Sequence, residues 1–291
     1  MHRINRRALM AASLLGLPAM AIQPLLASGS EAEVQRALAA LEQKHGGRLG
    51  VAIFDTATTA LIEHRGDEQF PLCSTFKLLA VAYVLSRVDR KLDSLHRRIT
   101  YEKEELVPYS PVTRMHTGEG MTLGALCEAA LTVSDNTAAN LLLDSYGGPA
   151  GLTAHLHSLG DNVTRLDRRE PDLNEAQPYD TRDTTTPLAM LETVRKIVLG
   201  DALSPASRER LIAWLVAGKT GLKRLRAGVP PGSRVADKTG SGGNNAANDI
   251  AVIWPPQRAP VVVTVYDVGS NATEAELSAV FAEIGRLATA S

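Results

Sequence analysis

A serine and a lysine one helical turn apart, Ser74 and Lys77, are the residues of this 291-residue chain whose types and spacing best suit covalent chemistry. They open the apolar stretch 74–88, and in a helix residues three apart lie on the same face. A desolvated lysine can act as the base that activates a serine hydroxyl. Backbone N–H groups at a helix start can stabilise a developing oxyanion. Taken alone, the pair is more typical of a helix N-cap followed by a surface lysine.

A second serine lies in Ser134-Asp135-Asn136, directly after the helical stretch 123–133. A hydroxyl with a carboxylate and an amide beside it can relay a proton and accept hydrogen bonds. The same three residue types are also the preferred residues for capping a helix. The tripeptide therefore allows both a catalytic and a purely structural interpretation.

A Lys-Thr-Gly-Ser sequence at 238–241 ends a strand-like stretch. A lysine, hydroxyls and exposed backbone along a sheet edge favour binding of a carboxylate and a peptide-like carbonyl, and glycines let a ligand approach the backbone closely. A second Lys-Thr-Gly, at 219–221, follows the helical stretch 208–216. That copy is predicted to be only the turn that ends the helix.

The elements that must position these motifs follow from hydrophobic periodicity. Strand patterns occur near both ends of the chain, and helical patterns fill its middle from about 71 to 215. A sheet assembled from the two ends, with a helical insertion between them, places its site in the cleft at the junction. The predicted terminal elements are a helix at 31–45, strands at 49–55, 60–63, 233–239, 250–254 and 261–265, and a final helix at 274–287.

Taken together, Ser-x-x-Lys, Ser-Asp-Asn and Lys-Thr-Gly in this order are the motif set of class A β-lactamases and penicillin-binding proteins. From about Glu31 to Ser291 the chain resembles a class A serine β-lactamase, a member of the penicillin-recognising serine hydrolases. The segment that decides between the two groups is Glu-Pro-Asp-Leu-Asn at 170–174. In the family, its Glu and Asn hold and activate the water that hydrolyses the acyl-enzyme. Arg168 and Asp183 match the ion pair that closes this loop in the family.

The resemblance implies an α/β two-part (α+β) fold: an antiparallel sheet flanked by terminal helices, plus an all-helical domain. Residues 1–30 would be a removed export signal, 31–70 and 216–291 the sheet-and-helix part, and 71–215 the helical part. The active site would lie at the junction of these two parts.

The resemblance also implies a role for each site residue. Ser74 attacks the lactam carbonyl, and the backbone N–H groups of Ser74 and Ser241 hold the oxyanion. Either Lys77, or Glu170 through a water, takes the serine proton. Ser134 protonates the departing nitrogen. The expected catalytic residues are Ser74, Lys77, Ser134, Glu170 and Asn174; the expected substrate-binding residues are Tyr109, Asn136, Arg224, Lys238, Thr239, Gly240 and Ser241.

Two of these binding residues bear on the range of substrates. Arg224 matches an arginine that reaches the substrate carboxylate in some members of the family, and the strand after Lys-Thr-Gly has no arginine to replace it. Arg224 together with Ser241 resembles members that act on bulky cephalosporins or carbapenems. Tyr109 matches the aromatic residue that lines the family's cleft, although a plain loop tyrosine is the alternative.

No metal or other cofactor is expected. The chain has no His-Glu-x-x-His and no His-x-His-x-Asp, and His155 and His157 diverge if they lie on a helix. Both are predicted to be surface residues. The two cysteines, Cys73 and Cys127, are expected to be free thiols, because the positions that bridge to their equivalents in the family hold no cysteine here.

The composition gives 31 basic against 32 acidic residues, without the basic excess typical of nucleic-acid binding. The resemblance implies small-molecule β-lactams as the partners and a monomer as the oligomeric state. The amino terminus carries Arg3, Arg6 and Arg7 before the apolar stretch 8–17, which is the layout of a twin-arginine export signal. No long apolar run follows. We expect a periplasmic protein without stable membrane association.

Two other functions share the first three motifs. A DD-peptidase acting on cell-wall peptides lacks the water-activating residues, so Glu170 and Asn174 argue against it. A catalytically inactive β-lactam sensor usually carries a membrane or signalling segment, and the sequence after the leader shows none.

Overall fold

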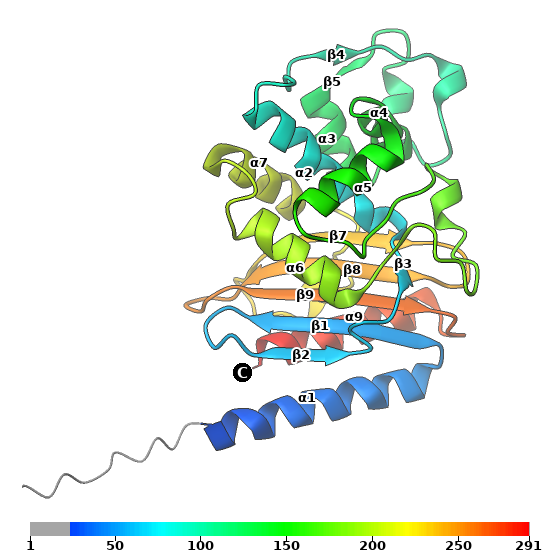
Figure 1. Ribbon diagram of the computed structural model, residues 1–291. Helices are drawn as coiled ribbons and strands as arrows, with labels where there is room; N and C mark the ends of the chain where they lie inside the picture. Colours follow the sequence, from blue (N-terminus) through cyan, green and yellow to red (C-terminus); the bar gives the residue numbers. More distant parts are fainter. Residues whose placement is uncertain (1–23, 291) are drawn as a thin grey trace, which may run out of the picture.

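Strands from both ends of the chain form one five-stranded antiparallel sheet in the computed structural model, which describes residues 24–290 (Figure 1). The strand order is β2-β1-β9-β8-β7. The first strand pairs with the last along its whole length, from Arg48 opposite Val268 to Asp55 opposite Val261. The strands are β1 (Arg48–Asp55), β2 (Leu61–His64), β7 (Arg234–Ser241), β8 (Ala247–Trp254) and β9 (Val261–Val268), with the short pairs β3 (Phe70–Pro71) with β6 (Thr184–Thr185) and β4 (Arg98–Ile99) with β5 (Met121–Thr122).

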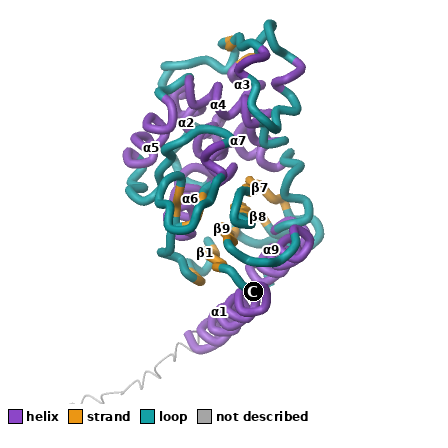
Figure 2. The backbone as a smooth tube through the Cα atoms, turned by 90° about the vertical axis from the view of Figure 1, so that its right-hand side faces the viewer, coloured by secondary structure: helices purple, strands orange, loops and turns teal. Residues whose placement is uncertain are grey.

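Alternate side chains of a strand point to opposite faces of the sheet, and apolar residues occupy both faces here. Helices therefore cover both faces. On β9, Val261, Val263 and Val265 belong to a core shared with the terminal helices α1 (Pro24–His45) and α9 (Glu274–Thr289). Val262 and Tyr266 point the other way, into the larger core shared with the helical part. Figure 2 shows the sheet lying between α9 on one side and α6 (Pro187–Val198) on the other.

The helical part lies beyond the β7 edge of the sheet and is built around α2 (Phe76–Asp89) (Figure 1). The residues from Phe76 to Ala82 are all buried, so this helix is surrounded by protein on all sides. Lys77 is among these buried residues. Around α2 pack α3 (Leu123–Thr132), α4 (Asn136–Asp144), α5 (Gly148–Ser158) and α7 (Pro205–Val216), and the short α8 (Leu225–Gly228) packs on α9.

The predicted fold class, an antiparallel sheet with terminal helices and a helical part, is confirmed, and several element limits differ. The first helix is longer than the expected 31–45 and spans Pro24–His45 in the described residues. The expected helix at 74–88 is α-helical only from Phe76, and Ser74 lies in the 3₁₀ turn Cys73–Thr75 that precedes it. Residues 1–23 of the expected leader, 1–30, lie outside the described residues.

The two cysteines are free, as expected, and both are buried. Burial raises the pKa of the Cys73 thiol to about 12, so this group next to Ser74 stays protonated. One surface prediction is wrong: His155 stacks on Tyr83, with ring centroids 4.0 Å apart and an angle of 9° between the planes. Because α5 packs on α2, burial lowers the pKa of His155 to about 4. No helix in residues 24–290 has the length and apolarity needed to cross a bilayer.

Asp135 joins the loop before α3 to the start of α4. Its Oδ1 accepts hydrogen bonds from the backbone N–H of Ala138 and the hydroxyl of Thr113, and its Oδ2 accepts from the backbone N–H groups of Val112 and Thr113. Asp135 is therefore the N-cap of α4 and a fixed point of the loop. The structural interpretation of Ser-Asp-Asn holds for this middle residue.

Replacing Asp135 with alanine is expected to lower the free energy of unfolding by about 2–4 kcal/mol, because it removes a helix cap and leaves buried donors without partners. Urea unfolding followed by circular dichroism measures the change. Asp67→Ala, at an exposed carboxylate, is the matched control and should change stability by less than about 0.5 kcal/mol. Similar losses in the two variants would contradict the role assigned to Asp135.

Candidate active site

The turn that carries Ser74 is fastened to the sheet by a residue the sequence did not single out. The Asn248 side-chain amide on β8 donates to the backbone carbonyls of Pro71 at 2.9 Å and Leu72 at 3.0 Å. A Cβ atom at Gly240 would lie 3.0 Å from the Cβ of Cys73, so the turn rests directly on β7. Gly240 was expected to let a ligand approach the backbone; in the structure, its missing side chain also leaves room for the turn that carries Ser74.

Lys77 connects Ser74 to the other polar groups of the site. Its Nζ lies 3.0 Å from Ser74 Oγ, 2.9 Å from Glu170 Oε1 and 2.6 Å from Asn136 Oδ1. It also donates to the backbone carbonyl of Ser134 at 2.8 Å and to its Oγ at 3.1 Å. An ammonium has three N–H groups, so these five oxygens share three protons. The predicted neighbourhood of a serine and a lysine is thus part of a larger buried network.

Ser134 lies between two buried lysines. Its Oγ accepts from Lys77 Nζ at 3.1 Å and from Lys238 Nζ at 3.1 Å. A hydroxyl has two acceptor positions and one donor. Because both acceptor positions are used by lysines, the hydroxyl hydrogen of Ser134 is free to point into the cavity.

Burial controls the protonation of both lysines. Each is almost fully buried, which disfavours the ammonium form. Burial lowers the pKa of Lys77, and the neighbouring Glu170 carboxylate partly opposes this. For Lys238, burial and then the charge of Lys77 lower the pKa to about 7. Both amines therefore release a proton more readily than a surface lysine does.

Glu170 reaches Ser74 from the loop between α5 and α6. Its Oε1 accepts a hydrogen bond from Ser74 Oγ at 3.1 Å, and its Oε2 accepts from the side-chain amide of Asn174. The backbone of Glu170 is fixed by Asn140 on α4, whose side chain donates to its carbonyl at 2.9 Å and accepts from its N–H at 3.0 Å. Sequence reasoning missed Asn140, which belongs to no motif and lies four residues after Asn136.

The loop that carries Glu170 is closed by an ion pair. Arg168 Nε lies 2.5 Å from Asp183 Oδ2, and the Arg168 guanidinium also donates to Glu175 at 2.7 Å. Asp183 Oδ1 accepts from the backbone N–H groups of Asp167 and Arg168. A Cβ at Gly242 would come within 2.6 Å of the Asn174 carbonyl, so the loop also presses against the strand end. These contacts hold Glu170 over Ser74.

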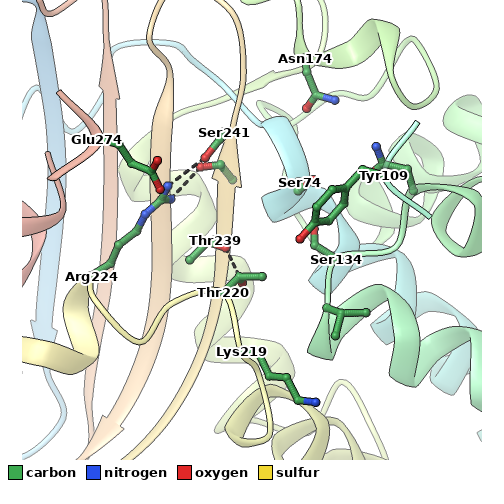
Figure 3. Close-up of a pocket in the computed structure, with 13 residues that line it drawn as sticks. Ser74, Tyr109, Ser134, Asn174, Lys219, Thr220, Arg224, Thr239, Ser241 and Glu274 are labelled. Atoms are coloured by element: carbon green, nitrogen blue, oxygen red, sulfur yellow. Dashed lines mark hydrogen bonds between the residues drawn. The ribbon is translucent and has the colours of Figure 1, made fainter. Parts of the chain in front are cut away.

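Most of the predicted residues meet around a cavity of about 570 Å³ (Figure 3). Figure 3 shows the Tyr109 ring beside Ser74 and Ser134, and the Tyr109 side chain is 62% exposed. Lys77, Glu170 and Lys238 lie buried beneath this surface. The predicted residues on the lining are Ser74, Tyr109, Ser134, Asn136, Asn174, Arg224, Thr239, Gly240 and Ser241; the lining also includes Val133, Lys219, Thr220 and Glu274, which were not predicted.

Arg224 is held on the sheet side of the cavity by three hydrogen bonds. One of its terminal nitrogens donates to the carbonyls of Gly240 at 2.8 Å and Asn248 at 2.6 Å, and the other donates to Ser241 Oγ at 2.8 Å. Its charge is therefore presented next to the Ser241 hydroxyl. On the opposite wall, the Asn136 amide donates to the Pro108 carbonyl at 2.9 Å, which leaves its second N–H available.

Behind Lys238, the sheet buries acidic groups. Asp237 forms an ion pair with Arg226, and Asp249 accepts from the backbone N–H of Leu225 at 3.1 Å. Burial raises the pKa of both carboxyl groups, and for Asp249 the neighbouring Asp237 adds to the shift. Among residues 24–290, no group of three or more His, Cys, Asp or Glu side chains is arranged to hold a metal ion.

Comparison with known proteins agrees with this geometry. Residues 33–291 match the model of the "Beta-lactamase enzyme family". The chain is 46% identical to β-lactamase CTX-M-8 of Citrobacter amalonaticus, over 91% of this chain and 90% of that one. It is 47% identical to β-lactamase OXY-1 of Klebsiella oxytoca, over 86% and 87%. A solved structure of an ancestral class A β-lactamase is 64% identical, covers 87% of this chain and 98% of that one, and superimposes with a TM-score of 0.86.

Sequence identity of this extent over most of each chain, a shared fold and a family model spanning nearly all of the described residues lead to one conclusion. The chain belongs to the family of class A β-lactamases, which are hydrolases.

Proposed function

We propose that this protein hydrolyses the β-lactam amide of penicillins and cephalosporins through an acyl-enzyme on Ser74, and that Glu170 activates the water that releases the product. The observation that carries the proposal is the position of Glu170. One of its carboxylate oxygens accepts from Ser74 Oγ at 3.1 Å, and the other accepts from Asn174. A general base in contact with the nucleophile can also reach the ester that this nucleophile forms.

In the acylation step, Ser74 Oγ forms a bond to the lactam carbonyl carbon and transfers its proton to a base. Two groups lie within hydrogen-bond distance of this oxygen: Lys77 Nζ at 3.0 Å and Glu170 Oε1 at 3.1 Å. The negative charge on the carbonyl oxygen would be stabilised by the backbone N–H groups of Ser74 and Ser241. The ring C–N bond then breaks, and Ser134 is the proton donor to the nitrogen, because its hydroxyl hydrogen is free of the two lysines.

Substrate recognition uses the two walls of the cavity. Lys238, Thr239, Ser241 and Arg224 would bind the carboxylate that accompanies the lactam ring; Lys238 also donates to the Thr239 carbonyl at 2.7 Å, which fixes its direction. Asn136 and the Gly240 backbone would flank the side-chain amide, and Tyr109 would cover the entrance. The same proposal places the site at the junction of two units, 31–70 with 216–291 and 71–215. The enzyme would act as a monomer and protect a bacterium from these antibiotics.

In the deacylation step, a water held between Glu170 and Asn174 attacks the ester carbonyl, and Glu170 accepts its proton. The bond between the carbonyl carbon and Ser74 Oγ then breaks, and the proton returns to Ser74 Oγ as the product acid leaves. Asn174 Oδ1 is buried and has no hydrogen-bond partner among the described residues, so it can accept from such a water. A DD-peptidase has no equivalent of this pair. The contacts of Glu170 and Asn174 therefore favour turnover over a long-lived acyl-enzyme.

Glu170→Gln is expected to accumulate an acyl-enzyme one benzylpenicillin heavier, with deacylation slowed by about 10³-fold or more, because glutamine keeps the shape but cannot accept a proton. Intact mass spectrometry beside turnover kinetics measures this. Asp172→Asn, at an exposed carboxylate in the same loop, should turn over as the wild type does. A wild-type protein that itself stays acylated would point to a penicillin-binding or sensor function.

The pKa of Lys238 sets an expected pH dependence. Because this pKa is lowered to about 7, the free enzyme loses the charge that attracts the substrate carboxylate as the pH rises through that value. We expect kcat/KM for benzylpenicillin to fall on this basic side. In Lys238→Arg the guanidinium stays protonated, so the fall should move to a higher pH. Profiles from pH 5.5 to 9.5 that coincide for the two proteins would rule out Lys238 as the titrating group.

The location in the periplasm, reached through a twin-arginine signal, is also part of the proposal. Replacing both Arg6 and Arg7 with lysine keeps the charge of the leader but removes the arginine pair. We expect β-lactamase activity to remain in the cytoplasm and antibiotic resistance to be lost, as measured by fractionation of a bacterial host. Export equal to that of the wild type would indicate a general secretory signal instead.

A further inference from the structure

The second Lys-Thr-Gly, at 219–221, has a place in the site that its sequence did not reveal. It follows the end of α7 at Val216, as predicted, but it also lines the cavity. The backbone N–H of Lys219 donates to the Thr132 carbonyl at 2.9 Å, at the end of α3 and two residues before Ser134. The hydroxyl of Thr239 donates to that of Thr220 at 2.6 Å. The segment is thus tied to both walls of the cavity.

The backbone of this segment is held tightly against β7. A Cβ atom at Gly221 would collide with the carboxylate of Asp237 on β7, and one at Gly218 would lie 2.9 Å from the Leu215 carbonyl at the end of α7. The position of Lys219 is therefore fixed, although its side chain is exposed. Figure 3 shows Lys219 beyond Thr220, at the opposite end of the cavity from Asn174.

Three charged side chains line the cavity: Lys219, Arg224 and Glu274. The Arg224 guanidinium donates its hydrogen bonds to two backbone carbonyls of the sheet and to the Ser241 hydroxyl. Figure 3 shows Glu274 beside Arg224 and away from Lys219. None of the ion pairs among residues 24–290 includes Lys219, so its ammonium is available to a ligand at its end of the cavity.

The chemistry of the substrate indicates what reaches this end. With the lactam carbonyl at Ser74 and the carboxylate at Thr239, a cephalosporin has its C3 substituent on the ring carbon next to the one that carries the carboxylate. Because Thr239 donates to Thr220 at 2.6 Å and both line the cavity, a substituent that leaves the ring beside the carboxylate and away from Asn136 would be directed toward Thr220. Resting on the proposed function, we propose that Lys219 is a specificity-determining residue that favours cephalosporins with an anionic C3 substituent over those with a cationic one.

The test uses three cephalosporins with the same thienylacetyl side chain. At C3 they carry a neutral acetoxymethyl group, a cationic pyridiniummethyl group or a sulfonate-bearing thiomethyl group. Values of kcat/KM are measured for the wild type, Lys219→Met and Lys219→Glu. Lys223→Glu is the matched control, because Lys223 is exposed on the same loop but does not line the cavity.

We expect the ratio of kcat/KM for the anionic over the cationic substrate to fall about fourfold in Lys219→Met and about tenfold or more in Lys219→Glu, as for an exposed charge pair removed or reversed. The neutral substrate should change least, and 0.5 M NaCl should shrink the effect. A ratio that changes equally in Lys219→Glu and Lys223→Glu would overturn the proposal. The effect would then come from the overall charge of the protein and not from a contact between Lys219 and the substituent. If the enzyme stays acylated, the proposed turnover fails, but acylation rates from intact mass still give the same ratio.

Discussion

The burial of two lysines beside one serine hydroxyl is the constraint on which this structure depends. Lys77 and Lys238 both contact Ser134, and neither reaches solvent. A buried charge is costly unless partners compensate it. Glu170 is in contact with Lys77, and the carboxyl groups of Asp237 and Asp249 favour the charged form of Lys238. Glu170 comes from the loop between α5 and α6, and Asp237 and Asp249 come from β7 and β8. If any one of these elements were displaced, a buried lysine would lose a partner that compensates its charge.

The site is also held in backbone conformations that non-glycine residues rarely adopt. Positive φ angles occur at Cys73 (42°), Tyr109 (63°), Ser134 (61°) and Asp183 (55°), all at or next to the functional groups. Such residues cost about 1–3 kcal/mol each and persist where the surroundings determine them fully. Asn248 holds the turn with Cys73, and backbone contacts hold Asp183. The two cores on either side of the sheet therefore supply the stability that offsets the strained turn at Ser74.

The sequence predicts well what depends on local spacing and poorly what depends on contacts between distant segments. Strand alternation and helical periodicity were enough for the sheet and its terminal helices, and the three motifs with 170–174 were enough to nominate the groups that meet at Ser74. The 3₁₀ turn at Ser74, the Asn140 and Asn248 anchors and the stacking of His155 follow from packing between elements far apart in the chain. The segment 219–221 shows this most clearly: three residues that end a helix locally become one wall of the cavity only because β7 lies beneath them.

The pairing of the first strand with the last has a consequence for synthesis. Within residues 24–290, β1 and β2 join the rest of the sheet only through β9, and α9 completes the core beneath it. During translation Ser74 and Glu170 leave the ribosome long before these closing elements do. The polypeptide therefore stays incompletely folded until its final residues have been made. Long-range pairing of this kind slows folding. A chain interrupted near its end would therefore retain every motif and still be unable to complete the sheet that supports them.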